Sequence, residues 1–382
     1  MPSYKAELLS HHYKGRIRPR AAYALGLIDK TARVASKVPG LANFALRAPG
    51  VSNLLKWAGG ITQDREAPSF APLSLQEWFK RRGGSRNPHG RKVIVFPDTF
   101  NNFMHTDVGV AAVEAIEAAG WHVVMPEGKV CCGRPLYDYG FLNMAERYLH
   151  RVLDALRDDI RAGTPIVGIE PSCLATFKDE LVKLLPNDED AKRMSKQVFH
   201  FAEFFQKFEI EPPKLNREAI VWGHCHHKAT GGIDSELDVL KKMGVQTEEV
   251  KGGCCGLAGS WGFEKDHHEL SMQIGDHALL PKVRDAELDQ LVIADGFSCK
   301  TQIEQGETGR RALHLAQVIQ VARDQGPDGP PPTAGRPEDP YYLKRPPAPT
   351  ALKAQRAAVV GAVAALFGSA GFAAIRRFRR GS

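Results

Sequence analysis

Two Cys-Cys-Gly turns recur along this chain within the same order of segments. Cys131 and Cys254 open the two turns and lie 123 residues apart, and Cys173 and Cys299 close the two repeats at a separation of 126 residues. In each repeat a strand-like run, a helical pattern and a second strand precede the turn, and a helix and a third strand follow it. Unrelated segments rarely share such an order and offset, so the sequence predicts a duplicated α/β unit, each with a small parallel sheet and flanking helices.

The pattern of apolar residues places the elements of each unit. In the first unit it predicts strands at 93–96, 121–125 and 164–170 and helices at 107–120 and 143–160. In the second unit it predicts strands at 219–222, 245–250 and 290–295 and helices at 235–244 and 267–280.

The chain divides by composition into five segments. We expect a basic helical segment and linker at 1–90, the first unit at 91–212, the second unit at 213–322, a proline-rich linker at 323–350 and an apolar and basic tail at 351–382. Within the first segment, residues 1–60 look helical with breaks at Pro19, Pro39 and Pro49, whereas 62–90 look like a linker. The proline-rich stretch is not expected to join a core.

Charge is unevenly distributed. The chain has 382 residues, 43% of them hydrophobic and 25% charged, which is ordinary for a soluble globular protein with two cores. The formal charge of +7 arises from the first 92 and last 40 residues, which suits an acidic partner or anionic lipid. No nucleic-acid motif or interleaving of aromatic and basic residues is present, so nucleic acid is not an expected partner.

Seven cysteines are present, an odd number, and no signal peptide is visible at Met1. Four of the seven form the two Cys-Cys pairs. In a reducing, cytoplasmic compartment this pattern indicates metal binding or redox chemistry rather than a disulfide scaffold. Buried cysteines without a ligand are the alternative.

In the second unit, four thiols are placed to converge. Loops that follow parallel strands gather at one edge of the sheet, so the four cysteines of this unit can meet: Cys225, Cys254, Cys255 and Cys299. Four thiolates suit an iron–sulfur cluster or a structural zinc, and the adjacent pair favours the cluster. Glycines Gly133, Gly253 and Gly256 let the backbone turn tightly and aim N–H groups at sulfur.

The first unit is one thiol short. Aligning VIVFPDT with AIVWGHC places Thr99 where Cys225 lies, which leaves Cys131, Cys132 and Cys173. The site is therefore degenerate, or it is completed by Asp98, by His105 or by a ligand from the other half. An open metal position that takes substrate or a small thiol is a further alternative.

Histidines cluster near the cysteines. His224, His226 and His227 flank Cys225 and can tune a cluster by hydrogen bonds or carry protons, and His224 is the one expected to bind the cofactor. His267 and His268 open a helix and are as readily capping or solvated residues. Three polar residues beside the terminal cysteines can be simple turn formers: Glu170, Asp295 and Lys300.

With these residues in hand, the chain resembles the CCG-domain (cysteine-rich) iron–sulfur oxidoreductases. The matching stretches cover about residues 1–320 and include DTFNNF (98–103), CCGRPLYDYGFLNMA (131–145), GIEPSCLATFKDE (168–180), HCHHKA (224–229), GCCGLAGSWGFEKDHHELSMQIG (253–275) and ADGFSCKTQIEQG (294–306). That family includes heterodisulfide reductase B-type subunits, glycolate oxidase iron–sulfur subunits and the C-terminal part of FAD-linked dehydrogenase/iron–sulfur fusion proteins. The resemblance is strongest to the last group.

The resemblance implies that the cysteines hold iron–sulfur clusters of the 4Fe–4S type and carry electrons from a flavin. The implied flavoprotein oxidises a 2-hydroxy acid such as glycolate, D-lactate or 2-hydroxyglutarate. No cysteine precedes Cys131 and no flavin fingerprint is visible, so FAD and a ferredoxin-like cluster domain are expected on a partner or on the rest of a longer chain. The chain is not expected to act as an enzyme alone.

Two other functions stay open at this point. One is a catalytic subunit that reduces a disulfide at its cluster, although each unit ends in a single cysteine instead of a C-x-x-C pair. The other is a zinc-stabilised scaffold.

Near the C-terminus, residues 357–375 form an uncharged run of 19 residues, close to the about 20 that cross a bilayer. The run consists mostly of small residues and is followed by four arginines, which conflicts with ordinary spanning. We therefore expect a peripheral position on the inner face of the cell membrane, with a packing tail as the alternative.

Overall fold

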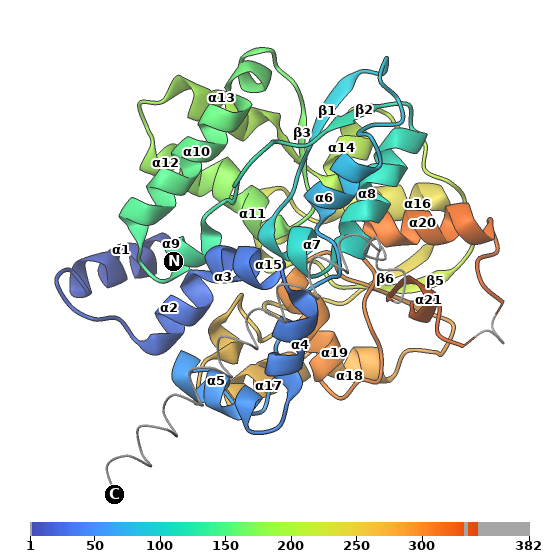
Figure 1. The fold of residues 1–382 in the computed structure, drawn as a ribbon. Helices are drawn as coiled ribbons and strands as arrows, with labels where there is room; N and C mark the ends of the chain where they lie inside the picture. Colours follow the sequence, from blue (N-terminus) through green and yellow to red (C-terminus); the bar gives the residue numbers. More distant parts are fainter. Residues whose placement is uncertain (1, 332–334, 343–382) are drawn as a thin grey trace, which may run out of the picture.

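The computed structural model describes residues 2–331 and 335–342, and two parallel sheets form its frame (Figure 1). The first sheet has the order β2-β1-β3-β4, with β1 at Lys92–Phe96, β2 at His122–Val124, β3 at Ile166–Gly168 and β4 at Val198–His200. The second has the order β6-β5-β7, with β5 at Glu218–Val221, β6 at Gln246–Glu249 and β7 at Leu291–Ile293. Every pairing is parallel. The α/β class and the two small parallel sheets are confirmed.

Helices surround both sheets. The first unit contains α7 (Thr99–Phe103), α8 (Thr106–Ala118), α9 (Arg134–Asp138), α10 (Leu142–Arg161), α11 (Pro171–Ala175), the π-helical turn η1 (Thr176–Glu180), α12 (Leu181–Leu184), α13 (Glu189–Gln197) and α14 (Phe201–Lys207). The second contains α15 (Cys225–Thr230), α16 (Asp234–Met243), the 3₁₀ turn η2 (Trp261–Phe263), α17 (His268–Asp276), α18 (Leu279–Arg284), α19 (Phe297–Gln305) and α20 (Leu315–Gln325).

Two elements differ from expectation. Strand β4, at Val198–His200, was not expected. The helix expected at 267–280 is divided into α17 and α18, since the backbone at Ala278 leaves the helical region with φ −146°.

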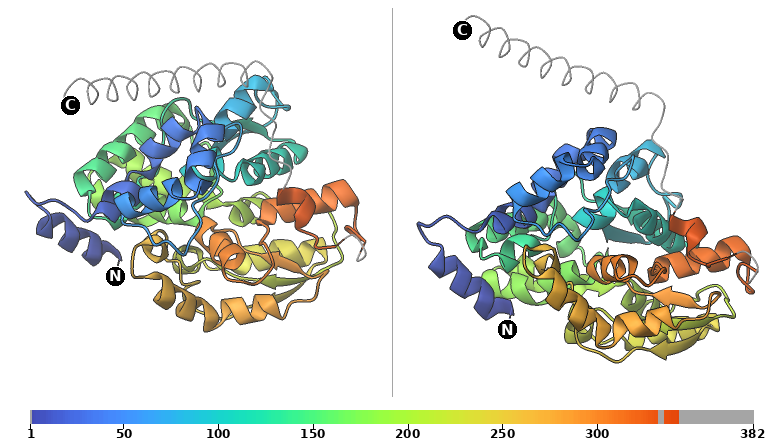
Figure 2. Two further views of the ribbon diagram at one scale, coloured as in Figure 1. Left: turned by 60° about the horizontal axis from the view of Figure 1, so that its bottom comes forward. Right: turned by 90° about the horizontal axis from the view of Figure 1, so that it is seen from below.

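The N-terminal segment forms a layer of five short helices on one side of the molecule (Figure 2). They are α1 (Pro2–His12), α2 (Arg20–Gly26), α3 (Ile28–Ala35), α4 (Pro39–Arg47) and α5 (Val51–Gly59). Pro19 directly precedes α2 and Pro39 is the first residue of α4, so both prolines lie where a missing N–H is harmless. The expected linker contains α6 (Leu75–Arg81), whose Leu75 is fully buried.

One hydrophobic cluster crosses the expected boundary between the units. It includes Val93 and Val95 of β1 together with Val221 of β5 and Ile293 of β7. Helix α20 also packs against α8, so elements of the two units share a core.

The described residues after the second unit return to this core. Tyr341 is buried in it, and Glu338 forms a buried ion pair with Arg310 at 2.8 Å. The proline-rich stretch was not expected to join a core. It nevertheless contributes two buried side chains, because single side chains can pack against an existing core even where the stretch cannot form one of its own.

The strand ends of the two units meet at a seam, which is defined by α7, α11, α15 and α19. Helix α11 packs against α15, and Phe100 of α7 stacks on Phe297 of α19 with ring centroids 4.2 Å apart. Glu170 at the start of α11 accepts a hydrogen bond from the N–H of Phe297 at 2.8 Å. Because α7 corresponds to α15 and α11 to α19, the two units meet with an approximate twofold relation.

Buried carboxyl groups lie at this seam. Burial and the neighbouring charge of Asp98 raise the pKa of Glu170 to about 7, against hydrogen bonds from Phe297 and Ser172 that lower it. Burial likewise raises the pKa of Asp98 to about 6. Both groups are therefore more easily protonated in the folded chain than in the unfolded chain.

This arrangement predicts a pH-dependent effect of Glu170. Because the pKa of Glu170 is raised from 4.5 to about 7, its protonated carboxyl group stabilises the folded chain fully at pH values below 4.5. This contribution to the free energy of unfolding is lost as the pH rises through about 7. Glu170→Gln removes the ionisation, so its stability relative to the wild type should rise by about 1 to 3 kcal/mol between about pH 5 and pH 8. Thermal melts followed by circular dichroism would measure the difference. The exposed Glu218→Gln is the control, and an equal offset at both pH values for Glu170→Gln would contradict the prediction.

Candidate metal centres

The structure brings the four cysteines of the second unit together at the ends of its strands. Cys225 is the first residue of α15 after β5, Cys254 and Cys255 follow β6, and Cys299 lies in α19 after β7. Cys225 contacts Cys254, Cys254 contacts Cys255, and Cys255 contacts Cys299. None of them forms a disulfide. We refer to these four thiols as the second cysteine group.

The three cysteines of the first unit also meet. The sulfur atoms of Cys132 and Cys173 are 2.7 Å apart, and Cys131 contacts Cys132. Thr99, the first residue of α7, donates a hydrogen bond to the sulfur of Cys131 at 3.4 Å. Thr99 therefore takes the place that Cys225 has in the second unit, as the alignment of the two strands predicted. These three thiols are the first cysteine group.

The two turns have the same backbone design. The N–H of Gly133 lies 3.5 Å from the sulfur of Cys131, and the N–H of Gly256 lies 3.4 Å from the sulfur of Cys254. Both glycines have positive φ, 79° and 97°, which other residues adopt only with strain. A Cβ at Gly256 would also approach the carbonyl oxygen of Ser271 to 2.1 Å, whereas a Cβ at Gly253 would meet nothing. The structure thus explains sterically why glycine is needed at Gly133 and Gly256, but it gives no such reason at Gly253.

Burial and mutual contact change the acidity of these thiols. In the first group, the hydrogen bond with Cys132 and burial raise the pKa of Cys131, and burial raises the pKa of Cys132. For Cys173 the hydrogen bond with Cys132 lowers the pKa, but burial and nearby carboxylates bring it to about 12. Protons therefore leave this group most readily when a cation replaces them.

In the second group the pKa shifts differ in direction, because Cys254 accepts hydrogen bonds from several neighbours. Contacts from Cys225 and Cys255 and the N–H groups of Gly256 and Ala258 lower the pKa of Cys254. The same contacts raise the pKa of Cys225 and of Cys255, with burial adding to the effect. Four convergent thiols with aimed N–H donors fit a thiolate-bound iron–sulfur cluster or zinc ion.

Two of the three histidines beside Cys225 face this group. His224 caps α15 by accepting the N–H of His226, and its Nε2 lies 3.5 Å from Ser298. The Nδ1 atom of His226 lies 3.9 Å from the sulfur of Cys225. Burial lowers the pKa of His224 to about 3 and that of His226 to about 4, so both are neutral at pH 7.

The other histidines lie elsewhere. His227 stacks on His200 with centroids 3.9 Å apart, and its Nδ1 is 3.7 Å from a carboxyl oxygen of Glu236. His200, Glu203 and His227 could together hold a cation, yet both oxygens of Glu203 bind Lys178 at 2.7 and 2.8 Å. The lysine charge opposes a cation there. His267 directly precedes α17 and stacks on Trp261, but its side chain makes no capping hydrogen bond to that helix.

The polar residues beside the terminal cysteines have structural partners. Glu170 caps α11, Asp295 accepts the N–H of Leu315 at 2.8 Å, and Lys300 donates to Gln317 at 2.8 Å. Glu170 and Asp295 thus hold the starts of α11 and α20, and Lys300 connects α19 to the Gln317 side chain of α20.

The two candidates for completing the first group do not supply a free ligand. One oxygen of Asp98 caps α7 through Phe100 and Asn101, and the other accepts from the Asn101 side chain at 2.8 Å. His105 packs edge-on against Phe297 with ring centroids 5.0 Å apart.

Sequence reasoning missed three charged residues near the cysteines. From the N-terminal layer, Asp29 reaches Thr99, with 3.4 Å between their oxygens, and Arg65 lies close enough to Cys255 to interact with its charge. Arg134, directly after the first turn, is buried, pairs with Asp138 at 3.0 Å and lowers the pKa of His226. No local pattern in the sequence predicts these contacts. The one available signal was the arginine that directly follows the first Cys-Cys-Gly turn.

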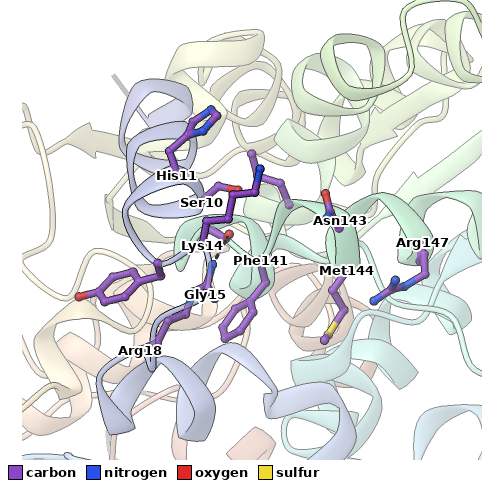
Figure 3. Close-up of a pocket in the computed structure, with 12 residues that line it drawn as sticks. Ser10, His11, Lys14, Gly15, Arg18, Phe141, Asn143, Met144 and Arg147 are labelled. Atoms are coloured by element: carbon purple, nitrogen blue, oxygen red, sulfur yellow. Dashed lines mark hydrogen bonds between the residues drawn. The ribbon is translucent and has the colours of Figure 1, made fainter.

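A separate surface pocket of about 460 Å³ lies between α1 and the start of α10 (Figure 3). Its lining includes four basic or potentially basic side chains, from His11, Lys14, Arg18 and Arg147, and no cysteine. Arg18 is held in place by the carbonyl of Gly140 at 2.8 Å. The pocket is therefore a basic surface feature distinct from the cysteine groups.

Comparison with known proteins found similarity to one family model and to several dehydrogenase-related proteins. Residues 99–178 match the model of the cysteine-rich CCG domain. The chain is 24% identical over 308 residues to a subunit of the anaerobic glycerol-3-phosphate dehydrogenase of Escherichia coli (strain K12), covering 78% of this chain and 76% of that protein.

Two further relatives differ in length. D-2-hydroxyglutarate dehydrogenase of Pantoea ananatis is 23% identical over 337 residues, which span 84% of this chain but only 32% of that protein. Lactate utilization protein A of Bacillus subtilis is 27% identical over 244 residues, 60% of this chain and 98% of that protein. Residues 99–178, which hold the first cysteine group, are therefore similar to the cysteine-rich CCG domain, in line with the resemblance drawn from the sequence.

Proposed function

We propose that this chain is an electron-transfer subunit, or part, of a FAD-linked oxidoreductase, with an iron–sulfur cluster on its second cysteine group. The observation that carries the proposal is the convergence of four thiols from three separate loops, reached by two aimed N–H groups. The kinship to proteins named as dehydrogenases or dehydrogenase subunits supports an oxidoreductase role.

The surrounding residues suit a group that accepts and donates single electrons. When bound, a cluster supplies that chemistry. Cys225, Cys254, Cys255 and Cys299 provide its thiolates, and the N–H groups of Gly256 and Ala258 offset negative charge on sulfur. Arg65 adds a buried positive charge near Cys255, while the neutral His226 limits the charge beside Cys225.

The partner proposed for this chain carries FAD and oxidises a small hydroxylated anion. The names of the relatives refer to glycerol 3-phosphate, D-2-hydroxyglutarate and lactate, and all three compounds are anions with an oxidisable hydroxyl group. A 2-hydroxy acid is the class we favour, because two of the three names refer to one. The ferredoxin-like cluster domain is proposed to lie on the partner or on a longer form of the chain.

The N-terminal layer offers a surface for that partner. Of the large hydrophobic side chains that are exposed in the described residues, all but Leu270 and Leu288 lie within residues 1–60. Trp57 and Phe44 are 62% and 67% exposed, and the basic pocket of Figure 3 adjoins the same layer. Such a combination of apolar and basic groups fits a protein surface with acidic residues at its rim.

Contact with a membrane stays a second part of the proposal. Within the residues that the structure describes, no helix has the length and apolar character needed to cross a bilayer. The apolar run 357–375 lies outside the described residues. We propose that it holds the protein peripherally on the inner, cytoplasmic face of the cell membrane.

The cluster assignment predicts the result of removing two thiols. In a Cys254→Ser, Cys255→Ser double variant, the second group should lose its iron and sulfide because serine hydroxyls are poor ligands for a cluster. Anaerobic purification, metal and sulfide analysis and visible absorbance would measure the loss. Unchanged iron would contradict the assignment, and stoichiometric zinc in the wild type would favour the scaffold alternative.

The two groups should differ in how firmly they hold iron. The first group has Thr99 where the second has Cys225, so its metal should leave first under a chelator. Time courses of iron release from Cys131→Ser and Cys254→Ser variants would separate the two pools. Equal iron loss in the two variants would show that the asymmetry is wrong.

The docking surface predicts which variants lose the flavoprotein. Phe44→Ser with Trp57→Ser should lower co-purified FAD several-fold without changing iron content, because the change removes exposed apolar contact area and leaves every cysteine in place. The control is Leu270→Ser, whose side chain is 50% exposed outside this layer. Equal FAD recovery in all three proteins would exclude this surface, and dehydrogenase turnover by the chain alone would exclude the need for a partner.

A further inference from the structure

The first cysteine group contains three thiols, and an acidic side chain from outside the unit reaches it. We propose that the carboxylate of Asp29 is the fourth protein ligand of this group, in the coordination place that Cys225 holds in the second unit. The inference extends the proposed function, because it assigns a metal site to the first unit as well.

The twofold relation of the units defines the vacant place. Thr99 and Cys225 both begin the helix after the first strand of their unit, and each contacts the first cysteine of its Cys-Cys pair. A threonine hydroxyl stays neutral at physiological pH, whereas a carboxylate is an anionic ligand like a thiolate. A metal group that needs four anionic ligands therefore requires one more here.

Asp29 is the acidic group that the structure places at this point. It lies on α3 and is 6% exposed, and its Oδ1 is 3.4 Å from the hydroxyl oxygen of Thr99. That hydroxyl is in turn 3.4 Å from the sulfur of Cys131, and the charge of Asp29 acts on this thiol. The carboxylate is thus next to the position of the absent thiol.

Arg33 fixes Asp29 on the turn. Its guanidinium binds Oδ1 at 2.7 Å and Oδ2 at 3.1 Å, and it also donates to the carbonyl of Val130 at 2.7 Å. Val130 directly precedes Cys131, so α3 is attached to the loop that carries the thiols. The single hydroxyl proton of Thr99 can go to Cys131 or to Oδ1 of Asp29, but not to both. When it goes to Cys131, one of the two lone pairs of Oδ1 serves Arg33 and the other is open to a metal.

The charges are consistent with this assignment. Three thiolates and one carboxylate carry the same four negative charges as the four thiolates of the second group. Arg33 pairs with Asp29 and offsets part of that charge, and the backbone N–H of Arg134 hydrogen-bonds Cys132. Carboxylate is a harder ligand than thiolate, so a site completed by Asp29 should hold a cluster less firmly, in line with the predicted asymmetry.

The other acidic and imidazole groups near these thiols are less suitable. The charges of Asp98 and Glu170 act on Cys173, whereas that of Asp29 acts on Cys131, the thiol beside Thr99. His105 packs on Phe297. Glu170 binds the N–H groups of Ser172 and Phe297. The rival role for Asp29 is to position the hydroxyl of Thr99 without touching metal, and the experiment must separate these two roles.

The test uses the full chain with Cys254→Ser and Cys255→Ser, so that iron on the first group is measured alone. In that background we compare Asp29→Asn, Asp29→Cys, Thr99→Val and the exposed control Asp64→Asn. Iron and sulfide content and the EPR spectrum of the reduced protein are the readouts, with circular dichroism to confirm folding. Asp29→Cys also removes the pair with Arg33, so it controls for damage from losing that contact.

If Asp29 is a ligand, Asp29→Asn should lower iron at least several-fold, while Asp29→Cys keeps iron with an altered EPR spectrum. Thr99→Val and Asp64→Asn should keep both iron and the original spectrum. Retained iron in Asp29→Asn, an equal loss in Thr99→Val or no iron in the background protein would each overturn the inference. The second cluster is judged separately, by the iron that the wild type loses on changing Cys254 and Cys255.

Discussion

The meeting of two sheet edges is the constraint on which the rest of this protein depends. Parallel strands release their loops at the carboxyl edge, and here two such edges face each other. The hydrogen bond from Phe297 to Glu170 and the stacking of Phe100 on Phe297 join the helices that begin there. Because Cys173 and Cys299 lie in two of those helices, the seam that joins the units also fixes both cysteine groups.

The same seam has to accommodate buried charge. Thiols that are buried together resist losing protons, so the chain surrounds them with N–H donors and arginines instead of water. Arg134 follows the first turn, Arg33 lies against the loop before it, and Arg65 reaches Cys255 from the N-terminal segment. His224 and His226 stay neutral because burial lowers their pKa, which avoids an excess of positive charge beside Cys225. The environment is thus arranged for anionic ligands that hold a cation.

The N-terminal layer contacts the cysteine-bearing units on its inner side and exposes apolar and basic side chains on its outer side. Towards the interior, Asp29 of α3 contacts Thr99 and Arg33 contacts the carbonyl of Val130, both next to the first cysteine group. In the segment that follows the layer, Arg65 binds Gly262, Ser271 and Gln302 beside the second group. Towards the exterior, the layer exposes apolar and basic side chains that its own unit does not cover. Asp29, the ligand proposed for the first unit, lies on α3 of this same layer.

The sequence alone determined the features that repeat locally. The paired turns and the apolar periodicity predicted every strand except β4 and four helical segments, which are α8, α10, α16 and the stretch that forms α17 and α18. They also predicted the grouping of the cysteines and the equivalence of Thr99 with Cys225, since each depends on order and spacing along the chain. Tertiary structure decided the facing of the two edges, the core shared across the units, the burial of Tyr341, and the approach of Asp29 and Arg65. Asp29 is 70 residues from Thr99, and Arg65 is 197 residues from Gly262. Contacts at such separations follow from how helices pack on the sheets, which no local pattern of residues encodes.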